Sequence, residues 1–187
     1  MVKKNTCIFI SGYGSNLKSL IKRSREYNFP AKIKLVVSNN SKANGIFYAK
    51  KNSIPYLLIN TKKRNFDFEI LKSLKKYKIS LICLAGYMKI IPKRLIRNFK
   101  KPIINIHPSL LPKFKGLNTY ERVLKNKEIQ TGCTVHHVSE KLDDGKIILK
   151  KRFFIQKSDN IKILKNKTQN LERIGFSEAI INLFRYN

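Results

Sequence analysis

Up to His107 the chain alternates short, almost continuously apolar runs with segments of helical periodicity. Strands that are covered on both faces are apolar throughout, and parallel strands need a helical crossover between them. The alternation therefore predicts an α/β fold with a doubly wound, mostly parallel sheet. The predicted strands are Thr6–Ser11, Ile33–Ser38, Tyr56–Asn60, Ile79–Ala85 and Pro102–Ile106. The predicted helices are Asn16–Tyr27, Ala43–Lys51, Phe66–Tyr77 and Pro92–Phe99.

The final third of the chain predicts a different arrangement. Two strands, Gly132–Val138 and Ile147–Phe154, flank a turn and are expected to form an antiparallel hairpin. A helix is expected at Thr119–Asn126, and an amphipathic helix at Ile174–Tyr186 closes the fold. Because no linker or internal repeat interrupts the pattern, residues 1–187 are expected to form a single domain. The inner side of the closing helix is expected to carry Ile174, Ala179, Ile180, Leu183 and Phe184.

The charge of the chain is strongly positive, with 40 Lys and Arg residues against 11 Asp and Glu residues and a net charge of +29. Such a field attracts polyanions and binds nucleic acid non-specifically at low salt. The lysines are spread over the whole length, however, and Lys, Asn and Ile are all abundant. This distribution favours the amino-acid bias of an A+T-rich genome over a selected nucleic-acid site. An anionic substrate would benefit from the same field in either case.

The apolar run Cys7–Ile10 near the N-terminus is far shorter than a signal-peptide core or a membrane span. A cytoplasmic protein without a membrane partner is therefore expected. The three cysteines, Cys7, Cys83 and Cys133, are widely spaced and form no CxxC pair. They are predicted to be buried, reduced thiols without a metal or redox role.

A polar amide and an imidazole end the strand Pro102–Ile106. Asn105 and His107 are two residues apart, so their side chains point to the same side, and Pro108 then stops the strand. Open α/β sheets place their ligands at the carboxyl ends of the strands. An Asn amide donates to a developing oxyanion, and a His acts as a general acid or supplies positive charge. The alternative is a hydrogen-bonded core histidine beside a capping asparagine.

Two further loops follow predicted strands. Gly12-Tyr13-Gly14 opens a helix, whose free N–H groups suit a phosphate monoester, although an ordinary tight turn has the same spacing. It is neither a Walker loop nor a complete dinucleotide fingerprint. The apolar segment Leu84–Pro92 suits a slot for a flat aromatic ligand. The alternative for this segment is that Met88 and Ile90 belong to the core.

The hairpin turn contains Asp143-Asp144-Gly145, which is ordinary turn chemistry. A carboxylate from this turn beside His107 would favour the protonated imidazolium. His136 and His137 precede the turn and alternate faces, so one of them is expected to pack inward as a satisfied histidine. A zinc site is not expected, because no Cys or carboxylate stands at ligand spacing from them.

Five motifs in order resemble the glycinamide ribonucleotide formyltransferases, the folate-dependent enzymes of purine biosynthesis. The motifs are Ser11–Asn16, Leu84–Ile90, Asn105–Pro112, Gly132–His136 and Leu142–Gly145. The resemblance covers nearly the whole chain and implies a Rossmann-like formyltransferase fold. It implies transfer of a formyl group from 10-formyltetrahydrofolate to the amine of glycinamide ribonucleotide, without a metal. A monomer or weak homodimer is expected.

The resemblance also assigns roles to single residues. It implies a catalytic group of Asn105, His107 and Asp143, in which the alignment of Leu142 and Gly145 favours Asp143 over Asp144. It implies that the substrate phosphate is bound by Gly14, Ser15 and Asn16. It implies that the folate is bound by Arg64, Met88, Lys89, Ile90, Ile91 and Asn105. Glu172 is similar to a family glutamate near the substrate.

Three rival functions remain. Formyltetrahydrofolate hydrolases resemble this chain but carry a further N-terminal domain, for which the first strand at Thr6 leaves no room. Methionyl-tRNA formyltransferases carry a further C-terminal domain and lack the first-loop motif. A basic RNA-binding relative without catalysis is the third, and it would show steeply salt-dependent RNA affinity.

Overall fold

The computed structural model describes residues 2–185 of the chain. The chain divides into two compact units, Met1–Ile104 and Asn105–Asn187. The first unit contains β1 (Lys4–Ile10), α1 (Ser15–Ser24), β2 (Ala31–Ser38), α2 (Gly45–Lys51), β3 (Tyr56–Leu58), α3 (Phe66–Lys76), β4 (Leu81–Leu84) and α4 (Lys93–Phe99). Strand β5 (Ile103–His107) begins in the first unit and ends in the second. The second unit contains α5 (Thr119–Lys125), β6 (Gln130–His137), β7 (Ile147–Phe154) and α6 (Ile161–Phe184).

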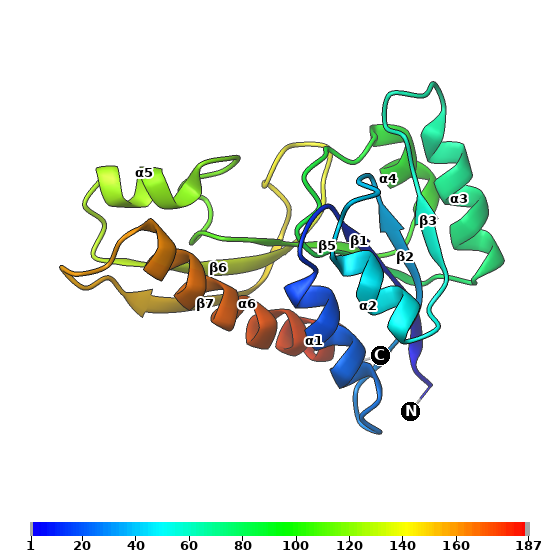
Figure 1. The fold of residues 1–187 in the computed structure, drawn as a ribbon, viewed down its shortest axis with the longest axis horizontal. Coiled ribbons are helices and arrows are strands. Elements are labelled where there is room, and N and C mark those ends of the chain that lie inside the picture. Colours follow the sequence, from blue (N-terminus) through cyan, green and yellow to red (C-terminus); the bar gives the residue numbers. More distant parts are fainter. Residues whose placement is uncertain (1, 186–187) are drawn as a thin grey trace. The chain divides into compact units, whose positions relative to one another are not determined.

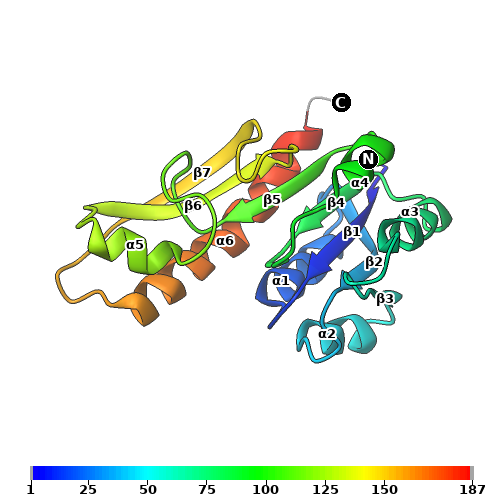
Figure 2. The same ribbon diagram turned by 90° about the horizontal axis from the view of Figure 1, so that it is seen from above.

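The first unit is a doubly wound parallel sheet. Its strand order is β3-β2-β1-β4, with the start of β5 beside β4. Strand β1 pairs in parallel with both β2 and β4, and β2 pairs in parallel with β3. Helices α1 and α2 lie on one face of these strands and α3 and α4 on the other (Figures 1 and 2). The strand order therefore reverses at β1, which is where such sheets place their ligand-binding loops.

The core of the first unit explains why its strands are apolar throughout. Residues Cys7–Ile10 of β1 and Leu81–Cys83 of β4 are completely buried. Leu17 and Leu20 of α1 are also completely buried, and α1 packs against β2. Each fully buried large aliphatic side chain contributes about 1.5–3 kcal/mol to folding relative to an exposed one.

The second unit is built on an antiparallel hairpin. Strands β6 and β7 pair from Gln130 opposite Phe154 to His136 opposite Ile147. Helix α6 packs along both strands, and α5 packs against α6 (Figure 1). The buried side of α6 includes Leu164, Phe176 and Ile180. The end of β5 lies next to β6 in the strand order.

These features confirm the predicted fold class. The predicted strands and helices other than the closing helix are present, with ends that differ by no more than three residues. The three cysteines are buried free thiols, as predicted. Burial raises the pKa of the Cys7 and Cys83 thiols well above the usual range. No helix among residues 2–185 has the length and apolar character that a membrane crossing requires.

The predicted start of the closing helix is wrong. Helix α6 begins at Ile161 instead of Ile174, because the Asn160 side chain caps it by accepting a hydrogen bond from the Ile163 N–H at 3.0 Å. Ile174, expected on the inner side, is exposed, whereas Ala179, Ile180 and Phe184 are buried as expected and Leu183 is half-buried. The predicted final residue, Tyr186, lies outside the described residues.

Candidate active site

The second unit brings Asn105, His107 and Asp143 together. Asn105 and His107 lie on the same side of β5, and His107 is buried. Asp143 lies in the turn between β6 and β7 with a positive φ of 48°, a conformation that Asp tolerates better than most residues. The turn packs tightly, because a Cβ on Gly145 would lie 1.7 Å from the His137 carbonyl oxygen. The turn thereby fixes the buried carboxylate of Asp143 beside β5.

Asp143 is the centre of this cluster. Its Oδ2 accepts a hydrogen bond from the Gly116 N–H at 2.9 Å and lies 3.3 Å from His107 Nδ1. Its Oδ1 lies 3.4 Å from Asn105 Nδ2, across 38 residues of sequence. Asp144 turns away and pairs with Lys115, whose hydrogen bond lowers the pKa of the Asp144 carboxyl. Asp143 is therefore the carboxylate that faces His107.

The ring of His107 lies between two oxygen acceptors. Its Nδ1 faces the Asp143 carboxylate, and its Nε2 lies 2.9 Å from the Phe114 carbonyl oxygen. Carboxylate and carbonyl oxygens only accept hydrogen bonds, so the doubly protonated imidazolium satisfies both contacts. Phe114 and Gly116 adopt positive φ angles of 58° and 80°, which turn the chain after β5 back toward this cluster.

His136 is a further member of the cluster that the sequence did not identify as functional. It is the inward-facing histidine of the pair, as predicted, and burial lowers its pKa. Its Nδ1 lies 2.8 Å from the His137 carbonyl oxygen, and its Nε2 lies 3.3 Å from Asn105 Nδ2. The sequence pattern predicts that one of the two histidines packs inward. It does not predict which residue of β5 lies next to that histidine.

The predicted phosphate-binding loop lies at the end of β1 in the first unit. Gly14 has a φ of 74° and caps the N-terminus of α1. A Cβ on Gly14 would lie 2.5 Å from the Gly45 Cα atom, so only glycine fits this contact between α1 and α2. Ser15 and Asn16 form the first turn of α1, where backbone N–H groups favour anions.

Ser11 joins this loop to the predicted folate segment. Its N–H donates to the Gly86 carbonyl at 3.1 Å, and its Oγ accepts from the Met88 N–H at 2.8 Å. The same Oγ donates to Asn39 Oδ1 at 2.6 Å. The structure therefore brings the two predicted segments together at the carboxyl ends of β1 and β4, with β2 as a third support through Asn39.

The predicted folate residues differ in exposure. Met88 and Ile90 are 68% and 77% exposed, so neither belongs to the core, whereas Ile91 is buried. Lys89 is exposed between them. Arg64 is exposed in the loop before α3, and its neighbour Asn65 accepts a hydrogen bond from Arg94 of α4. Two large apolar side chains exposed in the segment that Ser11 anchors through the Met88 N–H suit a flat apolar ligand.

Glu172 is buried on α6 in the second unit. Its carboxylate interacts electrostatically with Tyr120 of α5 and with Cys133 of β6. Burial is the larger cause, and the charge of Glu172 the second, that raises the pKa of the Tyr120 hydroxyl. The same two causes raise the pKa of the Cys133 thiol to about 12. Both neighbours therefore stay protonated around Glu172 at neutral pH.

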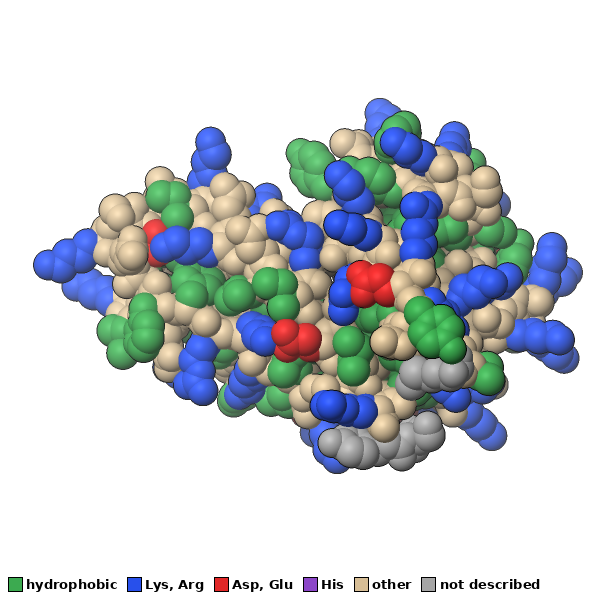
Figure 3. All heavy atoms as spheres, turned by 90° about the horizontal axis from the view of Figure 1, so that it is seen from below, with side chains coloured by type: hydrophobic (Ala, Val, Ile, Leu, Met, Phe, Trp, Pro, Cys, Tyr) green, Lys and Arg blue, Asp and Glu red, His purple; other side chains and the backbone are tan. Residues whose placement is uncertain are grey.

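The described residues contain no group suited to a metal ion, and the basic side chains on the face drawn in Figure 3 are scattered. Among residues 2–185, no group of three or more His, Cys, Asp and Glu side chains could hold a metal ion. Lys and Arg side chains are scattered over the face that Figure 3 displays, with few acidic side chains among them. The scatter agrees with a charge that is spread along the whole sequence.

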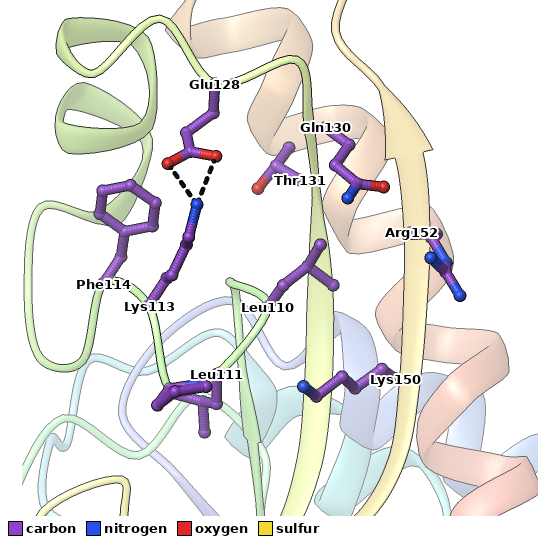
Figure 4. Close-up of a pocket in the computed structure, with 10 residues that line it drawn as sticks. Leu110, Leu111, Lys113, Phe114, Glu128, Gln130, Thr131, Lys150 and Arg152 are labelled. Atoms are coloured by element: carbon purple, nitrogen blue, oxygen red, sulfur yellow. Dashed lines mark hydrogen bonds and ion pairs between the residues drawn. The ribbon is translucent and has the colours of Figure 1, made fainter.

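A hollow of about 360 Å³ lies on the hairpin of the second unit (Figure 4). Lys113 and Glu128 pair across it at 3.0 Å, and Lys150 and Arg152 of β7 also line it. It contains none of the predicted site residues. It adjoins the cluster through Phe114, whose carbonyl faces His107.

Known proteins match this chain over most of its length. The family described as formyl transferase matches residues 4–180. The phosphoribosylglycinamide formyltransferase of Haemophilus influenzae is 38% identical over 173 residues, which cover 90% of this chain and 82% of that protein. The crystal structure of phosphoribosylglycinamide formyltransferase from Brucella melitensis has a TM-score of 0.91 at 34% identity, covering 99% of this chain and 97% of that chain.

Another match is to a longer protein. The human trifunctional purine biosynthetic protein adenosine-3 is 37% identical over 182 residues, which cover 95% of this chain and 18% of that protein. This chain therefore spans less than a fifth of the length of that trifunctional relative. Together the matches confirm the resemblance in five motifs and the fold class.

Proposed function

This chain belongs to the formyl transferase family, and we propose that it transfers a formyl group from 10-formyltetrahydrofolate to the amine of glycinamide ribonucleotide in purine biosynthesis. The proposal is supported by relatives named phosphoribosylglycinamide formyltransferase, which the chain covers over most of their length. The observation that carries it is the cluster of Asn105, His107 and Asp143 within one unit. An amide donor beside an imidazole that can carry a proton suits a reaction that develops negative charge on a carbonyl oxygen.

In the proposed reaction the substrate amine attacks the formyl carbon and a tetrahedral oxyanion forms. The new bond joins the amine nitrogen to the formyl carbon, and the bond from that carbon to the folate nitrogen breaks. The proton lost by the amine goes to the leaving folate nitrogen, through His107 or a water held by Asp143. Asn105 and protonated His107 stabilise the oxyanion. The activated carbon is brought by the folate, so the step needs no metal.

The contacts of His107 constrain its role. Stabilisation by positive charge needs no change in its hydrogen bonds, because the imidazolium is satisfied by Asp143 and the Phe114 carbonyl. Donation of a proton to the folate requires Nε2 to leave the Phe114 carbonyl. The charge role is therefore compatible with the present contacts of His107, whereas the proton role requires the segment after β5 to move.

We assign the substrates to the two units as the family resemblance suggests. The ribonucleotide phosphate binds Gly14, Ser15 and Asn16 at the start of α1. The folate lies along Met88, Lys89, Ile90 and Ile91, with Arg64 near its acidic end and Asn105 at the formyl group. Glu172 contacts the ribonucleotide. A single formyltransferase domain over residues 1–187, and a cytoplasmic monomer or weak homodimer, remain our predictions.

Absorbance-monitored formyl transfer tests the proposal. The assay uses a stable 10-formylfolate analogue, with and without glycinamide ribonucleotide. Folate release that depends on the ribonucleotide is the expected result. Equal release without the ribonucleotide would identify a hydrolase instead. A folded protein with no release at all would favour a relative that binds RNA through its charge, and its RNA affinity would then fall steeply with salt.

A further inference from the structure

His136 has a hydrogen-bonding arrangement that fixes which of its nitrogens carries the proton. Its side chain is 2% exposed. Its Nδ1 lies 2.8 Å from the His137 carbonyl oxygen, which can only accept, so Nδ1 carries a hydrogen. Burial lowers the pKa of His136, against the opposing charge of Asp143, whose Oδ1 lies 3.7 Å from Nε2. In the neutral ring that burial favours, the single hydrogen is the one on Nδ1. The remaining nitrogen, Nε2, therefore presents a lone pair.

That lone pair and the Asp143 carboxylate together determine the orientation of the Asn105 amide. The amide has one end that donates and one that accepts, and the two ends have nearly the same shape. The end that lies 3.3 Å from His136 Nε2 also lies 3.4 Å from Asp143 Oδ1. Both neighbours are acceptors, so the NH2 group must face them, and the reversed amide would place three acceptors together. A buried polar group that lacks a hydrogen-bond partner, or that faces a group of the same kind, destabilises the folded protein.

We propose that His136 is a positioning residue for the proposed formyl transfer, and that its neutral Nε2 holds the Asn105 amide with the NH2 group toward the developing oxyanion. This inference rests on the proposed function. Both contacts of the amide nitrogen are longer than the 2.9–3.0 Å typical of N–H···O bonds. One N–H can therefore turn to the reacting oxygen while the other stays on His136. His136 touches neither substrate in this role and acts through Asn105.

Two substitutions of His136 test whether the hydrogen-bond acceptor at Nε2 or the shape of the aromatic ring matters. His136→Phe keeps an aromatic ring but has no acceptor, whereas a Gln side chain can place its amide oxygen near the position of Nε2. We expect His136→Phe to lower kcat roughly tenfold with KM for both substrates little changed, and His136→Gln to retain most of the activity. His137→Phe makes the same change one residue along β6, on the opposite face, and is expected to leave kcat unchanged.

A double-mutant comparison of His136 and Asn105 distinguishes this positioning role from a general effect of altered packing around His136. In an Asn105→Ala background there is no amide to orient, so His136→Phe should lower kcat by less than about twofold. The same roughly tenfold loss in both backgrounds would overturn the proposal, because the effect would not pass through Asn105.

The tautomer of His136 gives a test that needs no activity. The chain has three histidines, so long-range ¹⁵N–¹H correlation spectra of histidine-labelled protein can be assigned with His136→Gln and His137→Phe. The expected result is a neutral His136 with the hydrogen on Nδ1. A hydrogen on Nε2 would overturn the role of His136 even in an active enzyme. A wild-type protein without ribonucleotide-dependent transfer would instead refute the proposed function, and the role of His136 with it.

Discussion

The loop after β1 and the cluster around Asp143 illustrate two ways of building a site. The loop consists of neighbouring residues, and its shape depends on the φ of Gly14 and the contact of Gly14 with Gly45. The cluster is assembled from β5, the β6–β7 turn and the segment around Gly116, and Asp143 joins them through hydrogen bonds. The turn at Gly14 depends on backbone geometry, whereas the cluster depends on the charge and hydrogens of a few buried side chains.

Substitutions in the loop and substitutions in the cluster are therefore expected to have different effects. At Gly14 of the loop, an added methyl group is expected to disturb folding and the fit of an anion. In the cluster, a change of one atom that preserves shape alters the charge beside the reacting oxygen. Changes in the loop should therefore appear in stability and KM, and changes in the cluster should appear in kcat.

The largest expected effect is that of Asp143→Asn. Asn tolerates a positive φ as Asp does, so the turn is preserved while the charge beside His107 is lost. We expect kcat to fall by about 10²–10⁴-fold with little change in the urea midpoint. Asp144→Asn is the matched control, because Asp144 pairs with Lys115 instead, and its kcat should stay near the wild-type value. Equal losses in the two variants would mean that Asp143 has no special role.

Gly14→Ala should have the next largest effect, and on stability. The residue has a positive φ, and the new Cβ would lie 2.5 Å from Gly45 Cα. We expect a loss of about 1–3 kcal/mol in the free energy of unfolding in urea, together with a higher KM for the ribonucleotide. Gly12→Ala is the neighbouring control, since nothing lies within 4 Å of its Cβ position. Similar losses for both would show that the close contact with Gly45 is not the cause.

A smaller effect is expected for Ser15→Ala. The hydroxyl lies in the first turn of α1, where the proposed phosphate contact is made. We expect KM for the ribonucleotide to rise roughly tenfold with kcat unchanged. Ser19→Ala lies one turn further along the same helix and should leave KM unaltered. A fall in kcat without a change in KM would place Ser15 in the chemistry instead of in binding.

The smallest expected effect is a pH dependence of stability. The folded-state pKa of His136 lies below the ordinary value near 6.5, so between the two values the unfolded chain binds more protons than the folded chain. Stability should therefore fall as the pH drops below about 6.5. From about pH 7.5 to about pH 5.5, the wild type should lose more unfolding free energy than His136→Gln. An equal or greater loss in the variant would show that His136 does not cause this decline.

The same comparison explains what the sequence could predict. Gly14, Ser15 and Asn16 are adjacent, and a glycine turn between a strand and a helix is visible in any single sequence. The hairpin was also visible, because Ile147–Phe154 is bounded by turn residues. The spacing of Asn105 and His107 at a strand end predicts them as candidates, with a core histidine as the alternative. The choice of Asp143 over Asp144 rests on the family resemblance, since neither spacing nor periodicity tells which turn carboxylate meets β5.

Two features could not be predicted for identifiable reasons. His136 contacts Asn105 because of the register between β5 and β6, which depends on packing rather than on local sequence. Helix α6 begins at Ile161 because Asn160 caps it. Its first turns are rich in lysine, so their apolar face is difficult to recognise in the sequence. In both cases tertiary contacts decide what the local pattern leaves open.

The most direct test of the central claim follows the transferred carbon itself. The protein is incubated with 10-formyltetrahydrofolate labelled with ¹³C in the formyl group and with glycinamide ribonucleotide, and the products are separated and identified by mass. We predict that the label appears on the ribonucleotide as a formylated amine, and that Asp143→Asn forms this product far more slowly. Label found only in free formate, with the ribonucleotide unchanged, would contradict the claim that this chain is a formyltransferase for that substrate.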